Sequence, residues 1–218
     1  MTAATTGRSS ARRTQSERRA DAEGRLIAAA AAIASEEGPS AVTLAKVGAR
    51  AGYSRGLVAH HFGSKAALMQ RVADQVSDEF RTAVFERYSA DAPLLDSLRM
   101  LLGVYFDIIA DLPELNRARL ALVADAVAHP GSDYRDVVLH ADREFRSALR
   151  RAIDGAAGEL PEGFDAETFS VLLVGALRGI AFESMLDPDV DLERARSELD
   201  ALLTARLTPP TDSSSFST

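Results

Sequence analysis

One segment constrains the fold of this chain more than any other: residues 43–65, TLAKVGARAGYSRGLVAHHFGSK. Residues that commonly cap helices recur along it at short intervals. Thr43, Ser54 and Ser64 carry hydroxyls that can accept hydrogen bonds from the unpaired amides of a helix N-terminus. Gly52 lies between the first two, where a helix can end in the left-handed conformation that glycine adopts most readily. The segment therefore predicts two short helices and the start of a third.

Apolar residues between these caps recur at helical spacing. Leu44, Val47 and Ala51 fall three and four residues apart, which places them on one inward face of the first helix, 44–51. Val58 and Phe62, four apart, share a face of the second helix, 55–62. Two helices of this length, joined by a short turn containing glycine, match the DNA-binding helix-turn-helix.

The order and spacing of these residues are more specific than a helix-turn-helix alone, and they resemble the TetR family of transcriptional regulators. The resemblance runs from about Leu26 to Leu68 and includes an N-terminal helix, Thr43-x-x-x-Val47, Ala51-Gly52-x-Ser54, His61-Phe62 and Ser64-Lys65. It implies an all-α homodimer of about nine helices per chain, with an N-terminal DNA-binding domain and a C-terminal ligand-binding and dimerisation domain. It also implies a repressor that a small-molecule effector releases from a palindromic operator.

Candidate DNA contacts lie around the second helix of the motif. Arg55, at its start, suits bidentate hydrogen bonding to O6 and N7 of guanine. Gly56 allows close approach of the backbone, and Leu57 or Ala59 can touch a thymine methyl group. The resemblance implies phosphate contacts at Thr43, Tyr53, Ser54, His60 and Lys65, and the basic side chains of Lys46 and Arg50 add two further candidates.

Three positions depart from the family pattern. The family commonly has an aromatic residue at the position of Ala59, an acidic residue at Lys46 and alanine at Gly48. Loss of the aromatic side chain removes one contribution to reading or clamping DNA. These departures affect the expected base contacts more than the expected phosphate contacts.

The charge of the chain is unevenly distributed. The net charge is −7, which alone would disfavour nucleic acid as a partner. Residues 1–70 hold ten basic and five acidic residues, a net charge of +5, whereas residues 71–218 hold 15 and 27, a net charge of −12. The basic end suits contact with phosphate, although chance asymmetry remains the alternative.

The chain divides into four expected parts. Residues 1–21 form a basic arm that is expected to be disordered, and 22–82 form the DNA-binding domain, with the helix-turn-helix at about 43–62. Residues 83–207 form the ligand-binding and dimerisation domain, and 208–218 form a disordered tail. The arm either enters an adjacent minor groove through its arginines or remains a solvated tail.

No strand alternation occurs, and proline and glycine divide the chain into helical segments. The expected helices are about 16–36, 44–51, 55–62, 65 to as far as Tyr88, 93–112, 114–129, 133–153, 165–186 and 191–207.

The last two segments suggest a second copy of the chain as a partner. Segment 169–186 is apolar on nearly every side, so it must bury more than one face. Two such helices from each of two chains would form an intermolecular four-helix bundle, and a monomeric core is the alternative. The expected interface residues are Leu172, Gly175, Gly179, Phe182, Leu199 and Leu202.

An effector pocket is expected among the helices between 93 and 186. Asp125 interrupts an apolar run and is suited either to a cationic ligand or to pairing with Arg117 or Arg119. The remaining candidates also suit a plain hydrophobic core. The candidate ligand contacts are Met100, Tyr105, Phe106, Asp125, Phe145, Phe169 and Phe182.

Several other classes of protein are disfavoured. The sequence has no nucleophile motif or cofactor loop, so we expect neither an enzyme nor a cofactor. His60 and His61 point about 100° apart on a helix, so no metal site is expected. The absence of cysteine, export signal and long apolar run favours a cytoplasmic protein without a membrane span. A ligand-independent architectural DNA-binding or adaptor protein remains the alternative function.

Overall fold

The computed structural model describes residues 14–85, 92–156, 158 and 160–208, and within these residues the chain is all-α, as predicted. Nine α-helices and one short 3-10 turn, η1 (Pro39–Ala41), account for the ordered elements, and these residues contain no strand. The helices are α1 (Gln15–Glu37), α2 (Leu44–Ala51), α3 (Arg55–Phe62), α4 (Lys65–Phe85), α5 (Leu94–Asp111), α6 (Pro113–Ala128), α7 (Arg135–Gly155), α8 (Ala166–Leu186) and α9 (Leu192–Leu207).

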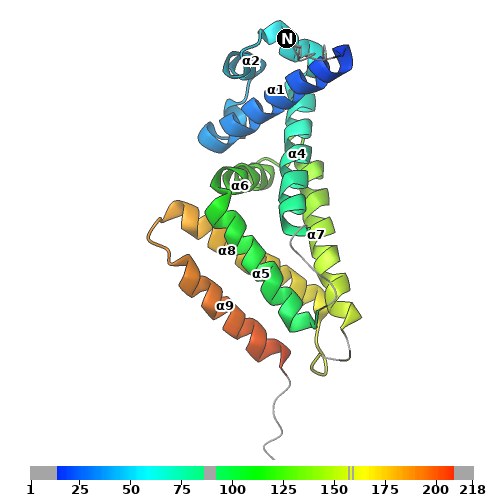
Figure 1. Ribbon diagram of the computed structural model, residues 1–218, viewed down its shortest axis with the longest axis vertical. Coiled ribbons are helices and arrows are strands. Elements are labelled where there is room, and N and C mark those ends of the chain that lie inside the picture. The colour runs from blue at the N-terminus through cyan, green and yellow to red at the C-terminus, as the bar shows by residue number, and fades with distance from the viewer. Residues whose placement is uncertain (1–13, 86–91, 157, 159, 209–218) are drawn as a thin grey trace, which may run out of the picture.

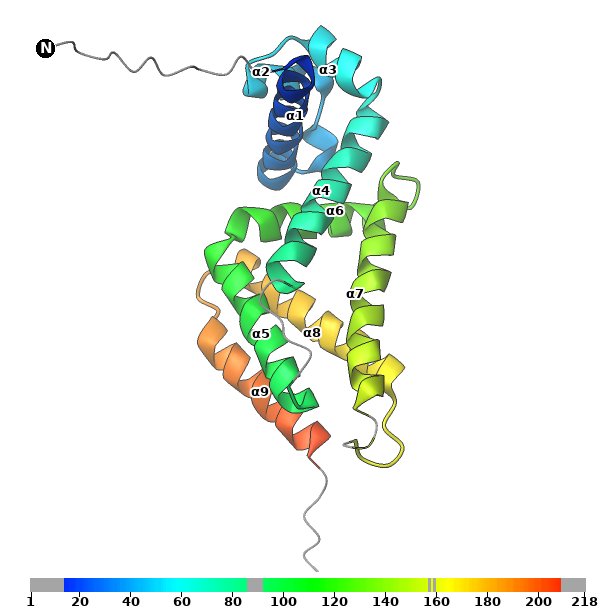
Figure 2. The same cartoon turned by 45° about the vertical axis from the view of Figure 1, so that its right-hand side comes forward.

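The helices form a small head and a larger body (Figure 1). The head contains α1 to α3 at one end of the molecule, and α4 runs from the head into the body. Helix α6 lies across the junction, beneath α1 and beside α4 (Figure 2). Helices α5, α8 and α9 occupy the far end, and α7 runs alongside α4.

The capping predictions for the helix-turn-helix are confirmed. Thr43 Oγ1 accepts from the Lys46 amide at 3.2 Å, and Ser54 Oγ accepts from the Leu57 amide at 3.2 Å. Gly52 ends α2 with a φ of 77°, in the left-handed region. Ser64 Oγ accepts from the Ala67 amide at 3.1 Å and so caps α4. These bonds fix both helices and the turn between them.

Helix α1 begins at Gln15, within one residue of the expected start, and so overlaps the arm expected at 1–21. Thr14 and Glu17 form a reciprocal capping box, in which Thr14 Oγ1 accepts from the Glu17 amide and the Glu17 carboxylate accepts from the Thr14 amide at 2.7 Å. Residues 15–21, which the sequence placed in a disordered arm, are therefore helical. The rest of the arm (1–13), the extension of α4 to Tyr88 and the tail from 209 onward lie outside the described residues.

Two hydrophobic cores hold the head and the body. The head core gathers buried residues of α1 to α4, among them Leu26, Val47, Val58 and Leu68, and it includes Leu122 of α6. The body core gathers apolar residues of α4, α5 and α7 to α9. Because α4 contributes to both cores and α6 packs against the head, these two helices join the head to the body.

Gly48 allows α2 to pack closely on the turn that follows it. A β-carbon at this position would lie 2.8 Å from the Tyr53 carbonyl oxygen and 3.1 Å from the Ser54 carbonyl carbon, both backbone atoms. Although the family commonly has alanine here, the turn in this chain leaves no room for its methyl group.

Gly48→Ala is therefore expected to lower the free energy of unfolding by about 1–3 kcal/mol, because the turn must move away to admit the methyl group. Gly24→Ala is the matched control, since a β-carbon on Gly24 of α1 meets nothing within 4 Å. That substitution should raise the free energy of unfolding by up to about 1 kcal/mol through helix propensity. Urea denaturation of both variants measures the difference, and equal stability of the two variants would contradict the close packing at Gly48.

Candidate nucleic-acid interface and ligand cavity

Helix α3 presents a polar edge to solvent while its apolar side packs on the head. Val58 is fully buried, which fixes the rotation of α3 about its axis. Arg55, Gly56 and His60 are exposed, and Leu57 and Ala59 are half-buried. The first turn of α3 therefore exposes both Arg55 and the backbone of Gly56, and an arginine so placed is accessible for hydrogen bonds to a base edge.

The residues predicted to contact phosphate differ in their exposure and in the hydrogen bonds that they already form within the protein. The hydroxyls of Thr43 and Ser54 already accept capping bonds, so each would contact phosphate by donating its proton. Tyr53 is half-buried and packs against the head core. Lys65 is exposed, and its Nζ donates to the Ser40 carbonyl oxygen at 3.1 Å, which holds the cation near the start of α4.

The two basic residues of α2 are paired with acidic residues at the end of α1. Arg50 donates from Nη1 to a Glu36 carboxylate oxygen at 2.6 Å, and Lys46 Nζ lies 2.7 Å from Glu37. The hydrogen bond with Glu36 raises the pKa of Arg50 and lowers the pKa of Glu36. The sequence does not reveal these pairs, because Glu36 and Glu37 lie in a separate helix. The pairing reduces the charge that Lys46 and Arg50 offer to phosphate.

The adjacent histidines have separate surroundings. His60 is exposed, whereas His61 is half-buried beside Phe62, with 6.1 Å between the ring centroids. Nδ1 of His61 is buried without a hydrogen-bond partner. Within the described residues, no group of three or more histidine or acidic side chains is arranged to hold a metal ion.

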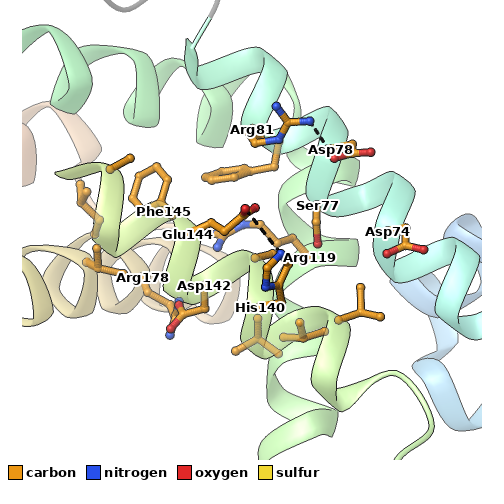
Figure 3. Close-up of a pocket in the computed structure, with 18 of the residues that line it drawn as sticks. Asp74, Ser77, Asp78, Arg81, Arg119, His140, Asp142, Glu144, Phe145 and Arg178 are labelled. Carbon is orange, nitrogen blue, oxygen red and sulfur yellow. Dashed lines mark hydrogen bonds and ion pairs between the residues drawn. The ribbon is translucent and has the colours of Figure 1, made fainter. Parts of the chain in front are cut away.

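A cavity of about 450 Å³ lies in the body, between α4, α5, α6, α7 and α8 (Figure 3). Its walls combine aromatic rings of α4, α5 and α7 with charged side chains of α4, α6, α7 and α8. Of the seven predicted ligand contacts, only Tyr105 and Phe145 line it. Charged residues outside the predicted set also line the cavity, among them Arg119, Asp142 and Arg178. The presence of Arg178 within the most apolar segment of the chain was the sequence signal that pointed to it.

The other predicted ligand contacts lie elsewhere. Phe106 is buried in the body core, Phe169 packs on Phe164 with ring centroids 5.0 Å apart, and Met100 and Phe182 are exposed. Asp125 contacts neither Arg117 nor Arg119, because its carboxylate accepts a hydrogen bond from Tyr134 Oη and lies 3.1 Å from Nδ1 of His129.

Tyr134 is the main partner of Asp125. Burial of the phenol and its hydrogen bond to the carboxylate raise the pKa of Tyr134 well above its usual value. The phenol therefore remains a proton donor at neutral pH, and Asp125 ties the end of α6 to the start of α7.

Helix α8 carries an exposed apolar stripe that α9 extends. Leu172, Gly175, Gly179 and Phe182 recur three and four residues apart and all are exposed, with 65% of Leu172 accessible. Leu202 of α9 is 66% exposed. A β-carbon on either glycine would meet nothing within 4 Å, so the stripe is open to close approach of another helix. Of the six predicted interface residues, only Leu199 is buried, in the core of its own chain.

Among the described residues, α8 is the one helix that is long and apolar enough to cross a membrane by length and composition. Its mean hydropathy is 1.6 over a window of which 28% is buried. The inner face packs in the body core through Leu173, Val174 and Leu177, and Arg178 pairs with Asp142 of α7. This packing is that of a core helix in a globular protein, with its second face exposed.

Comparison with known proteins is consistent with this architecture. Residues 26–72 match the family model of bacterial regulatory proteins of the tetR family, and residues 95–208 match the BetI-type transcriptional repressor C-terminal model. The chain is 30% identical over 190 residues to the HTH-type transcriptional regulator BetI of Burkholderia mallei, covering 84% of this chain and 93% of BetI.

Solved structures of regulators share the fold. The putative transcriptional regulator from Pseudomonas aeruginosa PAO1 is 26% identical with a TM-score of 0.74, over 88% of this chain and 91% of that one. The SmeT–triclosan complex is 21% identical with a TM-score of 0.72, over 87% and 93% of the respective chains. The matched family models and the BetI relative together show that this chain belongs to the TetR family of transcriptional regulators.

Proposed function

We propose that this TetR-family regulator is a homodimeric repressor that binds a palindromic DNA operator and is released from it by a small-molecule effector. The observation that carries the proposal is the connection of the helix-turn-helix to the ligand cavity. Helix α4 starts directly after the helix-turn-helix, and five of its residues line the cavity: Asp74, Ser77, Asp78, Phe80 and Arg81.

The exposed stripe of α8 and α9 supports a dimer. It is apolar on α8, α9 adds the exposed Leu202, and the two glycines leave room for the backbone of a partner helix. Two copies of α8 and α9 would form a four-helix bundle about a two-fold axis. A two-fold dimer presents two copies of α3 to major grooves about 34–36 Å apart, which requires an operator of two related half-sites.

Lys65→Ala is expected to weaken binding to all DNA sequences alike and to reduce the slope of log affinity against log salt by about one unit for each protomer. The reason is that an exposed lysine at the start of α4 would neutralise a phosphate without reading a base. Lys46→Ala is the matched control, and its effect should be smaller because Glu37 already pairs with Lys46. Titrations at several salt concentrations measure both slopes, and an unchanged slope in Lys65→Ala would contradict this docking.

An effector in the cavity would act through α4. A ligand changes the balance between two arrangements only through a difference in its affinity for them. A ligand between α4 and α7 that favours a wider spacing of the two heads would weaken operator binding. SmeT, which shares this fold, has been solved with triclosan, which supports a small-molecule role for the body.

The alternative is an architectural DNA-binding or adaptor protein without an effector. Such a protein is expected to have a filled core and to bind DNA without regard to sequence, whereas this chain has a cavity of about 450 Å³.

Sedimentation of the protein with a bound duplex tests the proposal. We expect a dimer in free solution and two chains on each duplex, and a monomer that coats DNA at increasing density would contradict the proposal.

A further inference from the structure

The carboxylate of Asp142, which lines the cavity of the body, is shared by two arginines. Arg178 pairs with Asp142, and Arg146 also lies 3.3 Å from the same carboxylate. Arg119, which lines the cavity beside them, has no carboxylate oxygen within 4 Å among the residues that the structure describes. The Nε atoms of Arg119 and Arg178 are both buried without a hydrogen-bond partner. This part of the cavity therefore has more positive than negative charge.

The guanidinium of Arg119 is held in a fixed position. Its Nη2 donates to Tyr105 Oη at 2.6 Å, and its Cζ lies 4.1 Å from the centroid of the Phe80 ring. The aromatic rings stabilise the cation, but neither neutralises its charge. Burial lowers the pKa of Arg119, which reflects the cost of removing this charge from water. A buried donor without a partner in a cavity wall is the feature that an incoming anion would satisfy.

The remaining acidic residues of the cavity do not neutralise Arg119. Asp78 pairs with Arg81 at 2.9 Å, and Glu144 lies 3.4 Å from His140. Figure 3 shows both pairs apart from the contact between Arg178 and Asp142. Asp74, on α4, is half-buried and lines the cavity. If the ligand were a cation rather than an anion, this carboxylate would be its expected partner.

We propose that the cavity binds a monocarboxylate with an apolar carbon skeleton. The carboxylate pairs with Arg119, and the apolar skeleton of the ligand lies against Phe80 and Phe145. The inference rests on the proposed function, because it names the chemical class of the effector for the same cavity. A planar guanidinium binds a carboxylate through two parallel hydrogen bonds, and about 450 Å³ accommodates a compact ligand of this kind.

The test uses three probes that share a phenyl ring on a four-carbon chain and differ in the polar group at its end: 4-phenylbutyrate, 4-phenylbutanamide and 4-phenylbutylamine. Calorimetric titration of the full chain without DNA should show the acid binding at least about 30-fold more tightly than the amide, since pairing with a buried charge is lost in the amide. Tightest binding by the amine, with loss of that binding in Asp74→Asn, would overturn the proposal. No saturable binding of 4-phenylbutyrate or of any straight-chain carboxylate from butyrate to decanoate at about 1 mM would also overturn it.

The variant Arg119→Met distinguishes direct pairing of Arg119 with the ligand carboxylate from a general effect of the positive charge of the cavity. It should lower affinity for 4-phenylbutyrate by at least about 30-fold and change affinity for the amide by less than about threefold. Arg151→Met is the matched control, because Arg151 lines the same cavity but is exposed. An equal loss in both variants would overturn the proposal.

Folding and function are checked independently. A melting temperature of unliganded Arg119→Met well below that of the parent chain would mean that Arg119 only holds the helices together. Tyr105→Phe keeps the guanidinium but removes its hydrogen bond, and it should lower affinity for the acid by less than Arg119→Met does. Carboxylate binding by a chain that binds no duplex would leave this inference standing and remove the proposed function, and the converse result would remove only the inference.

Discussion

Leu172→Glu is expected to convert the protein from dimer to monomer and to lower its affinity for a two-half-site operator by about 100-fold or more, because the two heads no longer bind as one unit. Leu172 begins the exposed stripe of α8 and is 65% accessible, so the proposed dimer would bury the glutamate carboxylate against the partner copy. A buried charge without a partner strongly disfavours such an interface. Sedimentation equilibrium and operator titration measure the two effects.

Val127→Glu is the matched control for this prediction. Val127 of α6 is 76% exposed and is not part of the stripe on α8 and α9. The same change of charge there should leave both the dimer and operator binding intact. If Leu172→Glu remains a dimer while its circular dichroism spectrum is unchanged, the interface lies on another surface.

Arg55→Ala has the second-largest expected effect. Each operator would meet two copies of Arg55, and loss of a bidentate contact with guanine costs roughly 1–3 kcal/mol at each. The loss should be confined to specific DNA, because Arg55 stands at the first turn of α3, beside the exposed backbone of Gly56. Binding-site selection with the variant should show one base position in each half-site that has lost its preference.

Arg143→Ala is the control for loss of a positive charge. Arg143 is exposed on α7. Helix α7 runs through the body, whereas α3 lies in the head (Figure 2). It should change neither affinity nor sequence preference. A loss of affinity in Arg55→Ala that is equal on all sequences would assign Arg55 to a phosphate and would leave base reading to other residues of α3.

The local features of the fold could be predicted because they depend on neighbours in the sequence. The caps at Thr43, Ser54 and Ser64 and the left-handed Gly52 follow from residue type and spacing alone. The start of α1 was predicted to within one residue, and the spacing of Thr14 and Glu17 is that of a capping box. The same residues were also assigned to a disordered arm, because 15–21 are polar and show no apolar periodicity.

The features that depend on distant residues could not be predicted. The pairing of Arg50 with Glu36 depends on the angle between α1 and α2, and that of Arg178 with Asp142 on the packing of α7 against α8. Apolar side chains such as Phe106 and Phe169 suit a core and a ligand cavity equally, so composition did not separate them from Tyr105 and Phe145. The buried arginines distinguish the cavity from the core.

Selection of binding sites from random duplex DNA by the purified protein tests the central proposal most directly. We predict enrichment of a palindromic motif whose half-sites are centred about one helical turn apart, since two copies of α3 would enter successive major grooves. Absence of any enriched sequence at low salt would contradict the account of a sequence-specific dimeric regulator.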